Sequence, residues 1–300
     1  MVVDFLWSRR AGALRLAIAA LAGLAAVCAA RAQQPGAPVR ERFMESIDPE
    51  TGARKLRSFR NQRLEGDYFF RFVFEHLPRR ARKSEYRGHM WGTWNERGPL
   101  SRIRLWTGES AQGEDGAPEE WILQGGASPE AWHREGRDGG FRKIRGDALF
   151  APVFEGVLHT PFDLLMPFTH WTQYEYEGPA RVRSRIVQEF LMQAPEGGRA
   201  EAAGVSAVRI ALDDAYDALL RAEVLGDDGS VVSRFAVESF KKVGGRYIVK
   251  EITLEDTASG DRTRFSVRAA AVGLDLDPAL FDAEAPAAAE APSNDVIESL

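Results

Sequence analysis

The stretch DYFFRFVFE at positions 67–75 constrains the fold of this chain more than any other feature. In an extended strand, successive side chains point to opposite faces of the sheet. One face of this strand then consists of aromatic rings alone, whereas the other mixes apolar and charged residues. A face of rings needs an apolar partner that removes it from water. The partner is either a packed core or an apolar ligand, and the residues alone leave both open. The four aromatic residues are Tyr68, Phe70, Phe72 and Phe74.

The next strand patterns extend this aromatic face. Lys83–Asn95 has the same two-residue period and places Met90 and Trp94 on one face of a second strand. Leu105 lies in a third strand pattern, Ser101–Thr107.

Glycines indicate where strands bend or end. Gly88 and Gly92 lie inside the second strand, which indicates a bend or room for a close neighbour. Between positions 181 and 270, six strand patterns follow one another, separated by turn signals such as Gly244-Gly245. Strands spaced this closely predict an antiparallel meander.

The apolar stretch Phe150–Phe168 differs from the strands around it. Pro152, Pro161 and Pro167 interrupt it, so it cannot form a regular strand or a long helix. It predicts short helical pieces that lie across a sheet.

The first 32 residues have the three parts of a secretory signal peptide: a basic start, a short apolar run and the cleavage site Ala30-Arg31-Ala32. The apolar run is shorter than the roughly 20 residues that cross a membrane. A retained anchor is one alternative. Lipid attachment to Cys28, the only cysteine, is another, although Val27 is large for the position before a lipidated cysteine. Cleavage after Ala32 leaves a chain without disulfides.

The remaining chain divides into three parts. Residues 33–48 are expected to form a linker and a short helix at Val39–Ile47, ended by Asp48-Pro49. Residues 49–282 are compatible with one mainly β domain. Residues 283–300 are rich in Ala, Pro and Glu and poor in large apolar side chains, which predicts a disordered tail.

The charge argues against a nucleic-acid-binding protein. Without the four basic residues and the one acidic residue of the signal, the chain has 35 Lys and Arg and 43 Asp and Glu, a net charge of −8. The segment Arg54–Arg104 nevertheless holds fourteen basic and five acidic residues. It predicts either a basic face for anionic head groups or an acidic partner, or arginines on the solvated face of strands.

Motifs for catalysis or metal binding are absent from the sequence. The five histidines are scattered singly, and there is no HExxH, G-x-S-x-G, phosphate-binding loop or dinucleotide-binding motif. We therefore expect no catalytic residues, no metal and no cofactor, and a protein that is not an enzyme. A hydrolase whose catalytic residues are dispersed along the chain remains an open alternative.

The second half of the chain resembles the outer-membrane lipoprotein-sorting protein family, which has the fold of the periplasmic carrier LolA. The resemblance rests on FKKVGGRYIVKEITLED at Phe240–Asp256, on the turn before residue 262, and on the closing GLDLDPALF at Gly273–Phe281. The stretch Pro167–Pro195 is similar to the broader branch of that family. No latch arginine is carried over from the carriers, because their cavity arginine matches no single position of this sequence. Arg71 faces away from the aromatic face.

The resemblance implies a mainly β (α+β) fold, in which a curved antiparallel sheet forms an unclosed half-barrel and short helices cover its concave face. The concave face would bind the acyl chains of a lipoprotein, another lipid, or a hydrophobic molecule passed to an inner-membrane transporter, with transient membrane contact. The implied groove residues are Tyr68, Phe70, Phe72, Phe74, Met90, Trp94 and Leu105. The implied lid residues are Phe162, Leu164, Leu165, Met166 and Phe168.

The alternative function belongs to another class. The chain would be a cell-envelope protein-interaction module with a closed core, no ligand cavity and a basic docking face. In both cases the secretory signal predicts that the protein works in the periplasm.

Overall fold

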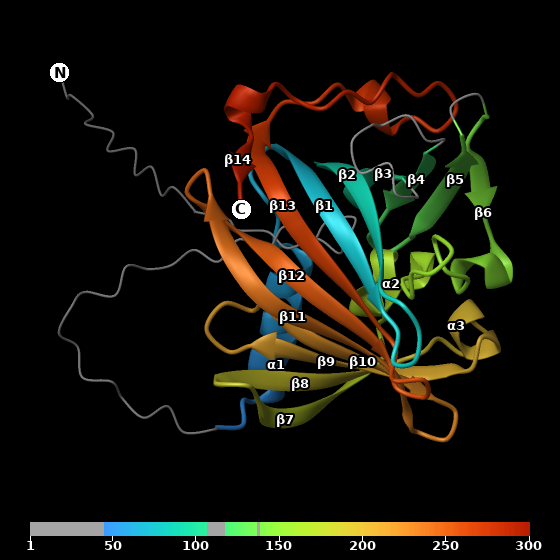
Figure 1. Ribbon diagram of the computed structural model, residues 1–300. Coiled ribbons are helices and arrows are strands. Elements are labelled where there is room, and N and C mark those ends of the chain that lie inside the picture. Colours follow the sequence, from blue (N-terminus) through green and yellow to red (C-terminus); the bar gives the residue numbers. More distant parts are fainter. Residues whose placement is uncertain (1–44, 107–117, 137–138) are drawn as a thin grey trace, which may run out of the picture.

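A computed structural model describes residues 45–106, 118–136 and 139–300. Within these residues, fourteen strands form one antiparallel sheet that does not close into a barrel (Figure 1). The order β6-β5-β4-β3-β2-β1-β13-β12-β11-β10-β9-β8-β7 leaves β6 and β7 as the two edges, and β14 adds to β13 outside this path. The predicted fold class, a curved antiparallel sheet with helices on its concave side, is therefore confirmed.

The strands follow the expected pattern closely. Their bounds are β1 Asp67–Leu77, β2 Ser84–Asn95, β3 Gly98–Trp106, β4 Glu119–Gln124, β5 Glu130–Glu135, β6 Arg142–Ile144, β7 Tyr174–Val182, β8 Arg185–Gln193, β9 Val205–Asp213, β10 Leu219–Gly226, β11 Val231–Val243, β12 Arg246–Asp256, β13 Arg262–Leu274 and β14 Glu298–Ser299. The segment predicted as one strand from position 181 is the second half of a hairpin, because β7 turns back at Arg183, which has a φ of 55°.

The centre of the sheet joins the two ends of the chain. Strand β1 pairs with β2 on one side and with β13 on the other, with Tyr68 opposite Val272. One meander, β1 to β6, and a second, β7 to β13, therefore meet along the β1–β13 pair. Because β1 is central, both of its faces need a cover.

On the concave face, helix α1, Pro49–Arg60, lies across the second meander (Figure 1). Its Leu56 and Phe59 belong to the main core. The prediction placed a helix before Asp48-Pro49, but residues 45–48 are not helical and this pair starts the helix instead. Asp48 is the N-cap and its side chain accepts the Thr51 N–H at 2.9 Å, while Pro49 suits the first helical position.

On the convex face, the C-terminal segment, residues 283–300, covers the first meander and is ordered. The prediction of a disordered tail is wrong. The Trp91 indole N–H donates to the Glu290 carbonyl at 3.0 Å, and Arg71 donates to the Asn294 side chain at 2.8 Å. Strand β14 pairs with β13, and Ala289 packs into a small core with Phe69 and Trp91. The segment is held through its backbone carbonyls and small side chains, which a composition argument does not detect.

The same segment covers a buried ionic cluster. Arg102 and Glu120 are each 1% exposed, and Glu120 also binds Arg104 and Arg134. The carbonyls of Leu280 and Ala287 accept from Arg102, and the Ala289 carbonyl accepts from Arg104. Of the two alternatives for the basic segment Arg54–Arg104, one continuous basic face does not form, since part of the segment is buried here and part lies on α1.

Two further observations complete the fold. Within the described ranges, no helix is both long and apolar enough to cross a membrane. The predicted signal peptide, Cys28 and most of the linker lie outside the described residues.

Candidate functional site

The aromatic side chains of β1 lie together on the concave face. The ring centroids of Tyr68 and Phe70 are 4.8 Å apart, and those of Phe72 and Phe74 are 5.3 Å apart. Phe265 on the neighbouring β13 comes within 4.9 Å of Phe72. These distances are typical of favourable aromatic pairs. The result is one continuous ring-lined surface across the centre of the sheet.

Two glycines of β2 make room for these rings. Gly88 lies opposite Phe72, and Gly92 lies opposite Tyr68. A Cβ atom on Gly88 would be 2.3 Å from the tip of the Phe72 ring, and one on Gly92 would be 1.9 Å from the Tyr68 ring. Each ring therefore lies flat over the neighbouring strand. The predicted room for a close neighbour is confirmed.

We expect Gly88→Ala to destabilise the protein, because the Phe72 ring must leave its place in a packed core. Overpacking of this kind costs about 1–3 kcal/mol. The free energy of unfolding, measured by urea titration, checks this. Gly140→Ala is the matched control, since nothing lies within 4 Å of its Cβ position. Equal stability of the two variants would contradict this packing.

A second structural unit covers the rings. We call residues 150–171 the lid segment. It contains helix α2, Pro161–Leu165, and the short 3-10 helix η2, Pro167–His170. Thr160 and Asp163 cap α2 reciprocally, and Met166 then reverses the chain with a φ of 44°. Pro161 starts α2, as the sequence predicts, and Pro167 likewise starts η2.

The lid segment packs into the main core but is weakly bonded to the sheet. In the described structure, no main-chain to main-chain hydrogen bond joins residues 151–171 to a strand. The Leu158 N–H donates to Thr263 Oγ1 at 3.0 Å, and the Trp121 indole N–H donates to the Val153 carbonyl at 3.1 Å. Arg60 of α1 donates to two carbonyls near the end of the lid segment. Side-chain packing therefore provides most of its attachment.

The titratable side chains of the lid segment include the fully buried His159 and the half-buried Asp163. Burial lowers the pKa of His159 to about 3, and its ring lies 4.8 Å from that of Phe74. Neither ring nitrogen has a hydrogen-bond partner among the described residues. Burial also raises the pKa of Asp163, whose carboxylate accepts from the Thr160 N–H and hydroxyl. The site is therefore almost wholly apolar.

The structure brings most of the predicted site residues together. Six of the seven groove residues and all five lid residues belong to one core cluster; Trp94 is only half-buried and lies outside that cluster. Sequence reasoning did not include further members of the surface from β3, β4 and β13, although they occupy the expected alternate positions. These residues are Ile103, Trp121, Leu123 and Phe265.

The cover is closed in this structure. Tyr68 is 4% exposed, and Phe70, Phe72 and Phe74 are 1–2% exposed. Burial raises the pKa of the Tyr68 phenol. The rings therefore act as core here, and an acyl chain can reach them only if the lid segment moves. Among the described residues, no group of three or more His, Cys, Asp and Glu side chains is arranged to hold a metal ion.

Comparisons with known proteins identify the fold. No protein-family model and no curated protein sequence matches the chain. Three solved structures are similar to it. A DUF1329 family protein from Desulfovibrio piger has a TM-score of 0.62 at 14% identity and covers 74% of this chain and 92% of its own. An outer membrane lipoprotein-sorting protein domain from Vibrio parahaemolyticus has a TM-score of 0.60 at 12% identity, with 72% and 89% covered.

The third is a LolA superfamily protein from Nitrosomonas europaea, with a TM-score of 0.56 at 12% identity, covering 79% of this chain and 98% of its own. At these identities the likeness shows the fold alone. The chain has a LolA-like fold, as the resemblance in its second half predicts.

Proposed function

We propose that this protein is a non-enzymatic periplasmic carrier that holds an acyl chain of a lipid or lipoprotein between the sheet and the lid segment. One observation carries this proposal: a continuous face of aromatic rings is covered by a segment that, among the described residues, has no main-chain to main-chain hydrogen bond to a strand. The predicted signal peptide supports the periplasm, and the LolA-like fold supports lipid or lipoprotein transport. An inner-membrane transporter is the expected donor or acceptor of the ligand.

Covering the rings with the lid segment and covering them with an acyl chain contribute free energies of similar size. Exposing one large apolar side chain costs about 1.5–3 kcal/mol, so lifting five lid side chains costs on the order of 10 kcal/mol. A palmitoyl chain contributes about 0.8 kcal/mol for each CH₂ group that it buries, roughly 12 kcal/mol in total. A long chain can therefore replace the lid side chains on the rings, whereas an octanoyl chain, with about half that energy, cannot.

A truncation of two rings under the lid segment tests the proposal. We expect Phe72→Leu/Phe74→Leu to weaken binding of a fluorescent palmitic acid probe by about tenfold, because the chain loses two ring contacts. Phe190→Leu is the control, since Phe190 is a fully buried ring beside Gly52 of α1 and is not one of the predicted groove residues. It should reduce stability, by less than the double variant because only one ring is changed, without changing probe affinity. Equal losses of affinity in both variants would show that the rings serve only as core.

The closed packing of the rings also favours the second candidate function, a protein-interaction module with no ligand cavity. Salt distinguishes the two. Docking through exposed charges weakens steeply as ionic strength rises, whereas binding of a buried acyl chain does not. Native mass spectrometry of residues 33–300 purified from the cell envelope adds a direct check. A co-purifying lipid or acylated peptide supports the carrier, and a clean protein mass with no probe binding supports the module.

A further inference from the structure

A small pocket lies at the open side of the sheet, apart from the predicted groove residues. Its volume is about 170 Å³, and it is lined by Pro129, Glu130, Lys143, Ile144, Arg145, Leu149 and Arg199. We call it the seam pocket, because it lies between edge strand β6 and α3, Arg199–Ala202, which follows β8. A single water needs about 10–15 Å³, so the pocket has room for a tetrahedral anion.

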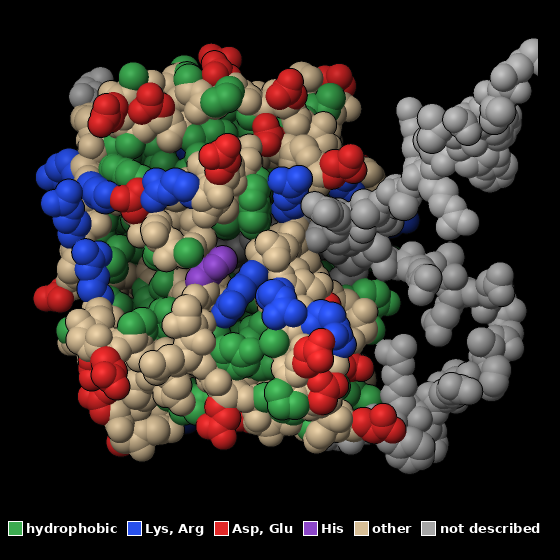
Figure 2. All heavy atoms as spheres, turned by 180° about the vertical axis from the view of Figure 1, so that it is seen from behind, with side chains coloured by type: hydrophobic (Ala, Val, Ile, Leu, Met, Phe, Trp, Pro, Cys, Tyr) green, Lys and Arg blue, Asp and Glu red, His purple; other side chains and the backbone are tan. Residues whose placement is uncertain are grey.

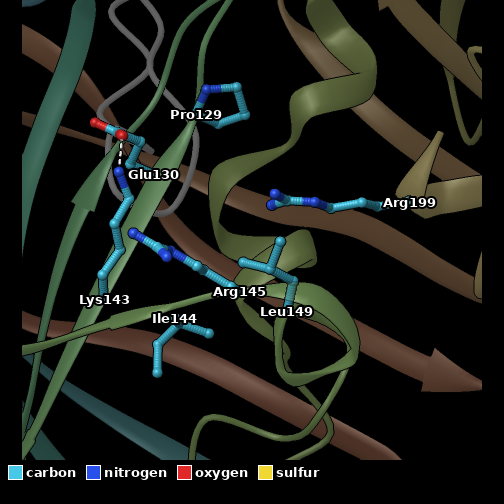
Figure 3. Close-up of a pocket in the computed structure, with 7 residues that line it drawn as sticks. All are labelled: Pro129, Glu130, Lys143, Ile144, Arg145, Leu149 and Arg199. Atoms are coloured by element: carbon cyan, nitrogen blue, oxygen red, sulfur yellow. Dashed lines mark hydrogen bonds and ion pairs between the residues drawn. The ribbon is translucent and has the colours of Figure 1, made fainter.

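The lining of the seam pocket is positively charged. Three cationic side chains face one carboxylate, and Glu130 is already paired with both Lys143 and Arg97. Among the residues that the structure describes, neither Arg145 nor Arg199 has an ion-pair or side-chain hydrogen-bond partner. Figure 3 shows Arg199 extending into the pocket from α3, opposite Lys143 and Arg145, which come from the β6 side.

Other arginines have carboxylate partners. Arg209 binds Glu177 of β7, and Arg221 binds Glu189 of β8. Guanidinium groups on opposite walls of one pocket, whose lining carboxylate Glu130 is already paired with Lys143 and Arg97, provide donors for an anion with several oxygens. The view opposite to Figure 1 shows that Lys and Arg side chains cross the middle of this face of the molecule, while Asp and Glu lie mostly toward its top and bottom (Figure 2).

The apolar part of the pocket connects these charges to the candidate site. Ile144 and Leu149 are partly buried and pack against the main core. Phe150, the residue after Leu149, is the first residue of the lid segment. Its ring stacks on the Phe162 ring, with 5.0 Å between the ring centroids. Cations at the surface and apolar side chains leading inward match the chemistry of an amphiphile with an anionic head.

We infer that the seam pocket binds the phosphate group of an anionic amphiphile through Arg145 and Arg199, with the acyl chain leading past Leu149 under the lid segment. This inference names the ligand class and, for the position of the chain, rests on the proposed function. The phosphate-binding part stands on the pocket alone. A free phosphate ion has the same chemistry and is a second source for the anion.

Calorimetric titration with three ligands separates these possibilities. Monododecyl phosphate carries head and chain, dodecyl maltoside carries the same chain on an uncharged head, and inorganic phosphate carries no chain; both amphiphiles are used below their micelle concentrations. We expect the wild-type protein to bind dodecyl phosphate about tenfold more tightly than dodecyl maltoside, because two charge-assisted contacts are added. Arg145→Gln/Arg199→Gln should remove this difference and leave dodecyl maltoside binding unchanged.

Arg80→Gln/Arg181→Gln is the matched control, since it removes two exposed positive charges that do not line the pocket. It should keep the preference for dodecyl phosphate. If the control loses the preference equally, or if the seam variant keeps it, the site is overturned. If inorganic phosphate binds through Arg145 and Arg199 and neither amphiphile binds, the seam site stands and the carrier proposal fails. If dodecyl maltoside binds as well as dodecyl phosphate, the carrier stands and the seam site fails.

Discussion

Oxidation of a Leu158→Cys/Thr263→Cys variant is expected to abolish binding of the palmitic acid probe, and reduction is expected to restore it. The 3.0 Å hydrogen bond between the Leu158 N–H and Thr263 Oγ1 leaves the two Cα atoms at most about 7 Å apart, close to the reach of a disulfide. The bond would tie the lid segment to β13 across the rings that the chain must reach. A tether of this kind removes the open state, whatever the affinity of the rings for the ligand.

The variant contains its own control, because the same protein is measured with the disulfide formed and reduced. Mass spectrometry after thiol labelling reports the fraction that is oxidised, and the two single cysteine variants report the effect of each substitution. Probe fluorescence is then compared at equal protein concentration. Equal binding by the oxidised and reduced forms would show that a ligand enters without movement of the lid segment at this point.

The second large effect, a loss of folding stability, is expected for Glu120→Gln. The Glu120 side chain is 1% exposed. Its carboxylate forms ion pairs with the guanidinium nitrogens of Arg102 at 2.6 Å, Arg104 at 2.9 Å and Arg134 at 3.1 Å. The variant keeps the shape of the side chain but leaves three guanidinium groups without their shared counter-charge. Breaking a buried ion pair by removing one partner costs about 3–5 kcal/mol. Glu130→Gln is the control: Glu130 also binds two cations, but at the surface, where such pairs are worth about 0–1 kcal/mol.

Lowering the pH should reproduce this loss of folding stability in the wild-type protein, because it protonates Glu120. Burial raises the pKa of Glu120, but its three arginine neighbours outweigh burial and hold the pKa below its ordinary value. The unfolded chain then takes up the proton more readily than the folded protein, so the stabilisation is fully present above the pKa of an unfolded Glu, about 4.3, and is lost as pH falls through the folded pKa. Urea titrations between pH 7 and pH 3 should show a flatter acid decline for Glu120→Gln than for the wild type. Parallel declines would assign the acid sensitivity to other carboxyl groups.

Local sequence patterns predicted those parts of the fold that depend on interactions between residues close together in the chain. The alternation in β1, the two glycines of β2 and the turns of the second meander follow from side-chain size and backbone freedom, which act over a few residues. The candidate site followed for the same reason, since alternate residues of a strand share one face. Whether that face is core or cavity depends on the lid segment, which lies far along the chain, and no local pattern decides it.

The failures of prediction have non-local or ambiguous causes. Asp48-Pro49 is compatible with the end of one helix and the start of another, and the apolar residues of α1 decide between them only once the sheet is present. The hairpin before β8 turns at an arginine rather than at a glycine, so its turn signal is missing. The C-terminal segment is ordered because the buried Arg102 and the partly exposed Arg104 bind its carbonyl groups, and these arginines lie almost 200 residues earlier in the chain.

The pairing of β1 with β13 has a consequence for how this protein is made. Tyr68 of β1 pairs with Val272 of β13, so one edge of β1 cannot form its hydrogen bonds until β13 has been synthesised. Contacts between such distant residues form slowly, because a long loop must close first. During that interval a strand with five aromatic residues presents an open edge, the kind of segment that aggregates. A truncation that removes β13 is expected to leave β1 unpaired on that side and prone to aggregation.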